Sequence, residues 1–268
     1  MRFNLFSLDD FISQIKLPLE THSDDYVYYY RGCSDHAWEY NLIPGIYRDN
    51  NIFEEDRYFR EMILGSPNDF FSEVTTLEKL VKMQHYTLPT RLLDITSNPL
   101  VALYFACGQY KETKTHGKVY LFKIKKEDLK YYDSDAISLI SNLAKLSMKK
   151  TNFNEGFDYL IHEIRVERNH FNDTLVKENE RDIQKIFPVK VMLNNSRIAR
   201  QSGAFLLFGI KSLNSKEEPA VFPKANIEKE LIIDESAKTA IRNTLNSLSI
   251  NENTLFPDLE HLANYLVR

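Results

Sequence analysis

The spacing of apolar and polar positions along the chain predicts strands interleaved with helices. Tyr26–Arg31 is dense in valine and tyrosine, and Lys118–Ile124 (KVYLFKI) alternates apolar and polar residues, so both predict strands. Four further segments predict strands on the same grounds: Arg91–Ile95, Phe187–Leu193, Ala204–Ile210 and Ile227–Ile233.

Helices are predicted where apolar residues recur every three or four positions. Ser7–Asp10 is an S-x-x-D capping box at the start of a short amphipathic helix. Ser97-Asn98-Pro99 begins a helix whose next residues, LVALYFA, are apolar on all sides, so this helix is expected to be buried. The other predicted helices are Phe53–Leu64, Phe70–His85, Gly156–His170, Ser196–Gln201, Ser236–Leu248 and Pro257–Val267.

The order of these elements favours an α+β fold. Strands are dispersed among helices without regular βα alternation, so a mixed or antiparallel sheet is expected rather than a doubly wound one. No Pro/Gly/Ser-rich linker divides the chain, so residues 1–268 are predicted to form one domain. Residues 24–126 and 187–234 are assigned to the sheet-containing core, 127–186 to a helical insertion and 235–268 to closing helices.

Composition narrows the functional classes. The formal net charge of −4 does not indicate the basic surface of a dedicated nucleic-acid binder. Cys33 and Cys107 have no CxxC spacing, which fits a reducing compartment and predicts no metal site. No stretch resembles a signal peptide or a membrane span, so a cytoplasmic protein with no membrane partner is expected. The P-loop, dinucleotide-binding, nucleophile-elbow and zinc-protease signatures are also absent.

Arg31 is the first candidate for chemistry. It ends a predicted strand and is followed by Gly32, so its guanidinium can be held in a cleft and grip a phosphate or carboxylate through two hydrogen bonds. Glycine there allows another backbone or a ligand to approach closely. The alternative is structural: Arg31 pairs with a nearby carboxylate, such as that of Asp94, and ties two segments together.

Polar side chains also gather between Gln84 and Ser97, directly before the buried helix. They lie beside the core and need partners, and a helix N-terminus favours anions. The segment offers an amide, an imidazole, a phenol, a guanidinium, a carboxylate and hydroxyls: Gln84, His85, Tyr86, Thr90, Arg91, Asp94, Thr96 and Ser97. The cluster is either a ligand site or a satisfied polar network that fixes a loop.

A third polar segment, Arg197–Gly203 (RIARQSG), precedes the strand Ala204–Ile210. It can form a second wall of the same cleft, with Gln201 among the ligand contacts. The alternative is a solvated helix face that ends at Gly203.

These segments resemble the FRG domain family, named for its Phe-Arg-Gly motif. The motif stands here as Tyr30-Arg31-Gly32, and the following residues match the family pattern at Ser34, Asp35, Trp38, Leu42, Pro44 and Arg48. Met83–Ala106 (MQHYTLPTRLLDITSNPLVALYFA) resembles a second family block, with Thr87 in place of Gly and Ile95 in place of Trp. RQSGAF and Leu255–Leu259 are similar to later blocks of the family.

A more distant similarity links two of these segments to ADP-ribosyltransferases of the arginine–serine–glutamate type. Tyr30–Gly32 and Ile95–Ala106 are similar to their first two elements, in the same order. The similarity implies an ADP-ribosyltransferase-like fold with NAD as the nucleotide ligand, and the family implies a prokaryotic defence or toxin role. The implied cofactor-binding residues are Arg31, Gly32, Gln84, Tyr86, Arg91, Thr96, Ser97 and Gln201, and the implied catalytic residues are His85, Asp94 and Arg31.

The third element of those enzymes, a glutamate on a late strand, has no counterpart. The expected strand is Ala204–Ile210, and neither it nor the preceding turn holds a glutamate. Gln201 can hydrogen-bond a ribose hydroxyl but cannot act as a base. Asp94 or His85 would have to supply the missing function.

Three alternatives to an enzyme that uses NAD therefore stay open. The chain is a module that binds a nucleotide or phosphorylated ligand without turnover, or a nuclease centred on His85 and Asp94. In the third, the polar cluster only stabilises the fold. The pI near 6.0 and the lack of clustered carboxylates for metal ions count against the nuclease.

Overall fold

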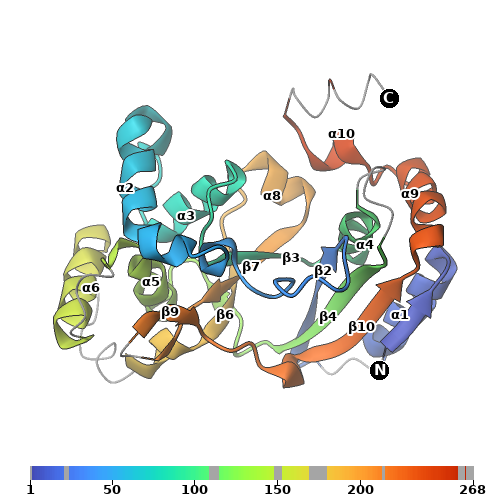
Figure 1. Ribbon diagram of the computed structural model, residues 1–268, viewed down its shortest axis with the longest axis horizontal. Coiled ribbons are helices and arrows are strands. Elements are labelled where there is room, and N and C mark those ends of the chain that lie inside the picture. Colours follow the sequence, from blue (N-terminus) through green and yellow to red (C-terminus); the bar gives the residue numbers. More distant parts are fainter. Residues whose placement is uncertain are drawn as a thin grey trace.

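A mixed β-sheet forms the centre of the protein in the computed structural model, which describes residues 2–20, 24–108, 115–147, 153–168, 180–212, 215–258 and 263 (Figure 1). Within these residues the main sheet has eight strands: β1 (Arg2–Leu5), β2 (Tyr26–Cys33), β3 (Leu92–Thr96), β4 (Gly117–Lys125), β5 (Lys130–Tyr131), β6 (Ile186–Lys190), β7 (Gly203–Phe208) and β10 (Ile227–Ile233). Their order across the sheet is β1-β10-β4-β2-β3-β7-β6-β5.

Both edges of this sheet are parallel pairs, and its interior is antiparallel. β1 runs parallel to β10 and β5 runs parallel to β6, whereas every other neighbouring pair is antiparallel. A separate hairpin pairs β8 (Ile210–Ser212) with β9 (Ser215–Pro219). The predicted α+β class with a mixed sheet is confirmed. The division into core, insertion and closing helices stays a prediction.

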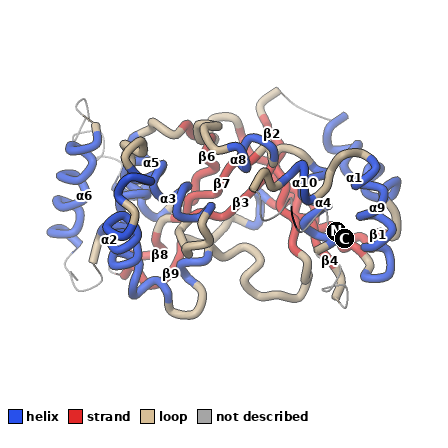
Figure 2. Tube along the Cα trace, turned by 90° about the horizontal axis from the view of Figure 1, so that it is seen from above, coloured by secondary structure: helices blue, strands red, loops and turns tan. Residues whose placement is uncertain are grey.

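Helices gather in two groups at opposite ends of the sheet, as Figures 1 and 2 both show. Near β4 and β10 lie α1 (Leu8–Glu20), α4 (Pro99–Cys107) and α9 (Lys238–Ser247); near β6 and β7 lie α2 (Glu55–Gly65), α3 (Thr76–His85), α5 (Asp135–Asn142) and α6 (Phe153–Glu167). The short helices α8 (Ser196–Arg200) and α10 (Glu252–Leu255) stand above the sheet in Figure 1. In the described part of the chain, no helix has the length and apolar character needed to cross a membrane.

The sheet consists of two halves that meet at a single residue pair. β2 pairs with β4 at eight positions, from Tyr26 to Cys33, and β3 pairs with β7 at five. Between β2 and β3 the only ladder pair in the described residues is Tyr30 with Thr96. Toward Gly32 and Asp94 the two strands do not pair, so the sheet opens at this point.

Among the described residues, three hydrophobic clusters pack around this split sheet. One packs α3, α5 and α6 against β6 and β7, and a second packs α1, α4 and α9 against β1, β4 and β10. The third lies between them on side chains of the central strands, including Tyr29, Leu93 and Phe122. The first two clusters thus belong to opposite ends of the sheet, whereas the third joins its two halves.

Several element boundaries differ from the sequence prediction. The helix expected over Phe70–His85 begins only at Thr76, because Thr75 and Glu78 form a reciprocal capping box. The strand β1 was not predicted, since four residues are too few to show alternation. The expected helix Pro257–Val267 lies almost entirely outside the described residues, whereas α10 forms just before it.

Candidate functional site

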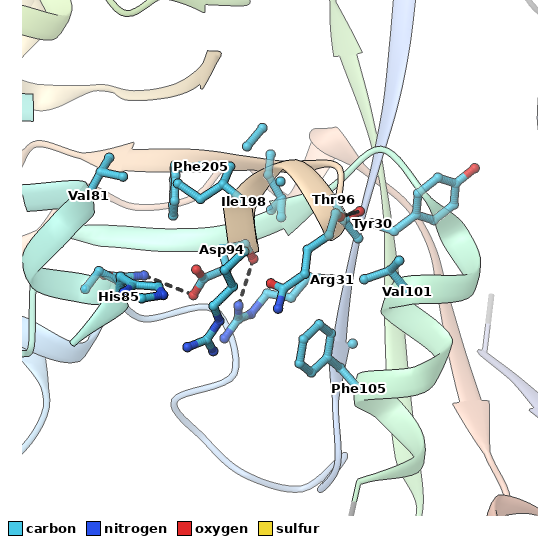
Figure 3. Close-up of a pocket in the computed structure, with 17 residues that line it drawn as sticks. Tyr30, Arg31, Val81, His85, Asp94, Thr96, Val101, Phe105, Ile198 and Phe205 are labelled. Atoms are coloured by element: carbon cyan, nitrogen blue, oxygen red, sulfur yellow. Dashed lines mark hydrogen bonds between the residues drawn. The ribbon is translucent and has the colours of Figure 1, made fainter. Parts of the chain in front are cut away.

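A cavity of about 270 Å³ lies where the two half-sheets separate (Figure 3). Its lining comes from β2, α3, β3, α4 and the α8–β7 segment. The lining residues are Tyr30, Arg31, Gly32, Val81, Gln84, His85, Asp94, Ile95, Thr96, Val101, Phe105, Arg197, Ile198, Gln201, Gly203, Ala204 and Phe205. Arg31, His85, Asp94 and Gln201, which are up to 170 positions apart in the sequence, therefore share one hollow.

The guanidinium of Arg31 bridges the opening between β2 and β3. Its Nε donates to the carbonyl oxygen of Asn41 at 2.9 Å, and its Nη1 donates to the backbone carbonyl oxygen of Asp94 at 2.8 Å. Among the described residues, no carboxylate forms an ion pair with Arg31. The expected structural pair with the Asp94 carboxylate is therefore not formed. Two backbone carbonyls orient the guanidinium, and its full charge faces the cavity.

The carboxylate of Asp94 is exposed and is oriented by Gln84. The side-chain amide of Gln84 donates to Asp94 Oδ2 at 3.0 Å, and the hydroxyl of Thr90 donates to the amide oxygen of Gln84. This relay sets which end of the amide faces Asp94. Figure 3 shows Asp94 between His85 and Arg31 at the same hollow.

His85 stands at the C-terminal end of α3, with its Nε2 4.0 Å from Oδ1 of Asp258. Burial lowers the pKa of His85, the charges of Arg197 and Lys82 lower it further, and Asp258 opposes them. The imidazole is therefore mainly neutral at pH 7 and can accept a proton or a hydrogen bond.

Thr96 and Gln201 tie the walls of the cavity together. The hydroxyl of Thr96 donates to the backbone carbonyl of Gln201 at 2.6 Å and accepts from the N–H of Asn98 at 3.0 Å. The side chain of Gln201 donates to the carbonyl of Leu255 at 3.1 Å. These hydrogen bonds link the end of β3 and the end of α10 to the turn after α8, around the hollow.

Comparison with protein families identifies the part of the chain that builds most of this site. Residues 26–115 match the family model of the FRG domain. The chain contains an FRG domain. The match spans about a third of the sequence and includes β2, α3, β3 and α4, which contribute Arg31, Gln84, His85, Asp94 and Thr96. No curated protein and no solved structure matches the chain, so the similarity to ADP-ribosyltransferases stays a prediction.

Gly32 of the FRG motif is required by packing against α4. A Cβ at this position would lie 1.8 Å from the backbone oxygen of Ala102 and 2.8 Å from the nitrogen of Ala106. The close approach that the sequence suggested is therefore made by the backbone of a helix. This contact holds α4 close to β2 and keeps Val101 and Phe105 of the helix in the cavity lining.

A second FRG-domain arginine, Arg48, lies near Arg31. Arg48 donates to the carbonyls of Ile43 and Tyr40 and stacks on Trp38, with its Cζ 4.5 Å from the ring centre. Burial lowers the pKa of Arg48, and the charge of Arg31 is the next cause. The two guanidiniums thus bind backbone carbonyls of the same segment, residues 40–43.

Three residues expected to bind the cofactor do not line the cavity. Arg91 is 0% exposed, and its guanidinium pairs with both carboxylate oxygens of Glu55 at 2.8 and 2.5 Å. It is a buried structural ion pair and cannot grip a ligand without leaving the core. Tyr86 packs edge-on against His85 on the outer side, and the hydroxyl of Ser97 contacts the backbone of Ser202. The other expected residues, Arg31, Gly32, Gln84, His85, Asp94, Thr96 and Gln201, all line it.

The cavity lining also includes Phe105 of α4, whose place in the site was not foreseen, and Arg197 of the segment expected to form a second wall. Phe105 of α4 packs edge-on against Phe256 at 6.1 Å, and Arg197 lies 4.7 Å above the ring of Phe256. The signals in the sequence were the RIARQSG segment and the block after Thr254, but neither showed which side chain would turn inward. Within the described residues, no three His, Cys, Asp or Glu side chains gather as metal ligands.

Proposed function

We propose that the cavity at the split of the sheet binds a nucleotide through a phosphate on Arg31, with NAD as the first candidate. One observation carries this proposal: the partly buried guanidinium of Arg31 is positioned by two backbone carbonyls and has no carboxylate partner in the described residues. Carbonyl dipoles orient a cation without neutralising it, so the site favours an anion. A phosphate can take the unused N–H groups of the planar guanidinium through paired hydrogen bonds.

Neighbouring charges support an anionic ligand. Arg48 adds a second guanidinium close enough to Arg31 to lower its own pKa, and Asp94 is the nearby carboxylate. Together, these three groups carry a formal charge of +1. Because the walls are partly apolar, the attraction for a phosphate is stronger than at an open surface.

The size of the cavity limits how much of the ligand it encloses. At about 270 Å³ it lies just below the range of about 300–1,000 Å³ usual for drug-sized ligands. It would therefore enclose one nucleoside and its phosphate, leaving the remainder of a dinucleotide outside. Phe105 belongs to the apolar part of the cavity lining, where its ring can contact a base or a nicotinamide ring.

A second candidate function, ADP-ribosyl transfer, is favoured by the carboxylate of Asp94. It is exposed at the cavity, oriented by Gln84 and close to the proposed phosphate site. In that position it could stabilise the oxocarbenium-like state that forms as the nicotinamide bond breaks, the task of the missing glutamate. A role in prokaryotic defence or as a toxin belongs to this candidate.

Calorimetry with the folded protein tests the binding proposal. NAD, ADP and AMP should release or absorb heat on binding, and Arg31→Lys should weaken the best ligand by at least ~10-fold, about 1.4 kcal/mol. Arg57→Lys is the matched control, because Arg57 lies outside the cavity and pairs with Glu54 on the surface. Absence of heat with all three nucleotides would refute nucleotide binding.

Measurement of free nicotinamide tests the transfer candidate separately. With NAD bound, Asp94→Asn should abolish nicotinamide release while leaving affinity within ~3-fold, because the amide keeps the shape but not the charge. Binding without any release of nicotinamide would leave the non-catalytic binding module as the function.

A further inference from the structure

A second cavity, of about 400 Å³, adjoins the first across the C-terminal end of α3. Val81 and His85 line both cavities, and their spacing of four residues places them on the same face of the helix. The remaining lining comes from other residues of α3 and the turns on either side of it, from Tyr132 and from the segment after β6. This second cavity contains none of the residues that hold Arg31.

Large apolar side chains are exposed around this second cavity. Tyr86, Tyr132 and Met192 line it and are 56%, 36% and 38% exposed. Three more exposed apolar residues are chain neighbours of lining residues: Phe71, Val74 and Leu193. A concentration of exposed apolar side chains around a concave site is typical of a protein-binding surface.

The charge at the second cavity is negative. Glu73 and Glu78 both line it, and the single lysine, Lys82, is committed to Glu73 Oε1 at 3.1 Å and to a backbone carbonyl. The other oxygen of Glu73, Oε2, is buried and has no hydrogen-bond partner among the described residues. The two glutamates outnumber Lys82 by one charge at this cavity, so its lining favours a cationic group.

We propose that this second cavity docks a polypeptide segment that presents a lysine or arginine next to an aromatic or aliphatic side chain. The cation approaches Glu73 and Glu78, and the apolar side chain packs among Tyr86, Tyr132 and Met192. The docked segment contacts His85, which lines both cavities. Docking of the segment does not depend on the nucleotide proposal; only its use as the acceptor in a transfer reaction rests on that function.

Phage display tests this proposal. A library of random 12-residue peptides is selected for binding to the intact chain. The enriched peptides should carry Lys or Arg within two positions of an aromatic or aliphatic residue. In fluorescence anisotropy, the labelled synthetic peptides should bind at least ~10-fold more weakly to Tyr86→Ala/Met192→Ala, since aromatic and methionine contacts carry such interfaces. Phe53→Ala is the control, because Phe53 is 47% exposed but lines neither cavity.

Glu73→Gln tests the charge contribution and should weaken the same peptides, with a thermal melt to show that the variant is folded. The peptides should bind Arg31→Lys as tightly as they bind the wild type. NAD should bind Tyr86→Ala/Met192→Ala as tightly as it binds the wild type. These two controls distinguish a failure of the docking proposal from a failure of the nucleotide proposal. Enriched peptides without a cation, or equal binding by all variants, would overturn the docking proposal. Failure to enrich any peptide would do the same, as would self-association of the chain that Tyr86→Ala/Met192→Ala abolishes.

Discussion

Two arginines of the FRG domain show how the partner of a guanidinium determines its role. Arg91 is enclosed and neutralised by both oxygens of Glu55, with a further hydrogen bond to the carbonyl of Phe208. Arg31 is oriented by two backbone carbonyls and forms no ion pair with a carboxylate in the described part of the chain. The first arrangement contributes to the fold, and the second leaves charge for a ligand.

Replacing Arg91 by methionine should therefore lower the free energy of unfolding by about 3–5 kcal/mol, because Glu55 is left buried without its counter-charge. Denaturant titration measures the loss. Arg57→Met is the surface control and should unfold close to the wild type, since Arg57 and Glu54 are both exposed to solvent. An Arg91→Met protein as stable as the wild type would contradict the structural role assigned to this pair.

His85 should make stability depend on pH. Its pKa is lowered in the folded protein by burial, by Arg197 and by Lys82, while Asp258 acts in the opposite direction. The unfolded chain therefore takes up the proton first, so stability is complete above about pH 6.5 and falls as pH drops below that value. Thermal melts from pH 8 to pH 5 should show a shallower fall for His85→Asn than for the wild type, and parallel curves would exclude this cause.

At the scale of elements, the contact between β2 and α4 controls the geometry of the site. Gly32 lets the backbone of α4 cross the strand at a distance that leaves no room for a side chain. The same helix begins with Asn98, whose Oδ1 accepts from the N–H of Leu100, and with Pro99 in its first turn. The placement of α4 thus depends on the cap at its start and on the close approach of Gly32 to Ala102 and Ala106 further along the helix.

Gly32→Ala should cost about 3 kcal/mol or more, because the helix must shift to admit a methyl group against the oxygen of Ala102. Gly65→Ala is the control: no atom lies within 4 Å of its added Cβ, and alanine favours the end of α2 by up to about 1 kcal/mol. Circular dichroism during denaturation measures both. A Gly32→Ala protein of native stability would show that α4 packs less closely than the structure indicates.

Elements with strong local signals were predictable, and those set by distant contacts were not. β2, β4 and α4 could be predicted because their patterning and caps lie within a few residues. The helix over Phe70–His85 was extended too far, since the Thr75 and Glu78 capping box was not recognised inside an apolar run. The contacts of Leu255 with Gln201 and of Phe256 with Arg197, at the end of α10, could not be inferred from local sequence.

For the whole molecule, sequence alone showed which segments hold polar groups but not which groups face one another. Arg31 lies near the end of β2 and Arg91 directly precedes β3, so the sequence alone allowed either arginine to be the ligand contact. The distinction depends on Glu55, which lies 36 positions from Arg91 in the chain. Similarly, Thr96 and Gln201 meet across 105 positions, a contact that no local pattern specifies. The FRG resemblance pointed to one cluster of polar residues, and the tertiary structure divides it into members that line the cavity and members that do not.

Because the half-sheets share one ladder pair, a ligand in the cavity should act as an additional link between them. Arg31 stands on one half, whereas Asp94 and Gln201 stand on the other, so a nucleotide that contacts both sides binds the closed arrangement better than an opened one. Hydrogen exchange with saturating NAD should slow in residues 92–98 and 201–205, which border the join, and change little in β1 and β10. Arg31→Lys should remove this protection. Protection spread evenly over the sheet, or confined to the helices near β10, would place the ligand elsewhere, since only a molecule at the opening can oppose separation of β2 from β3.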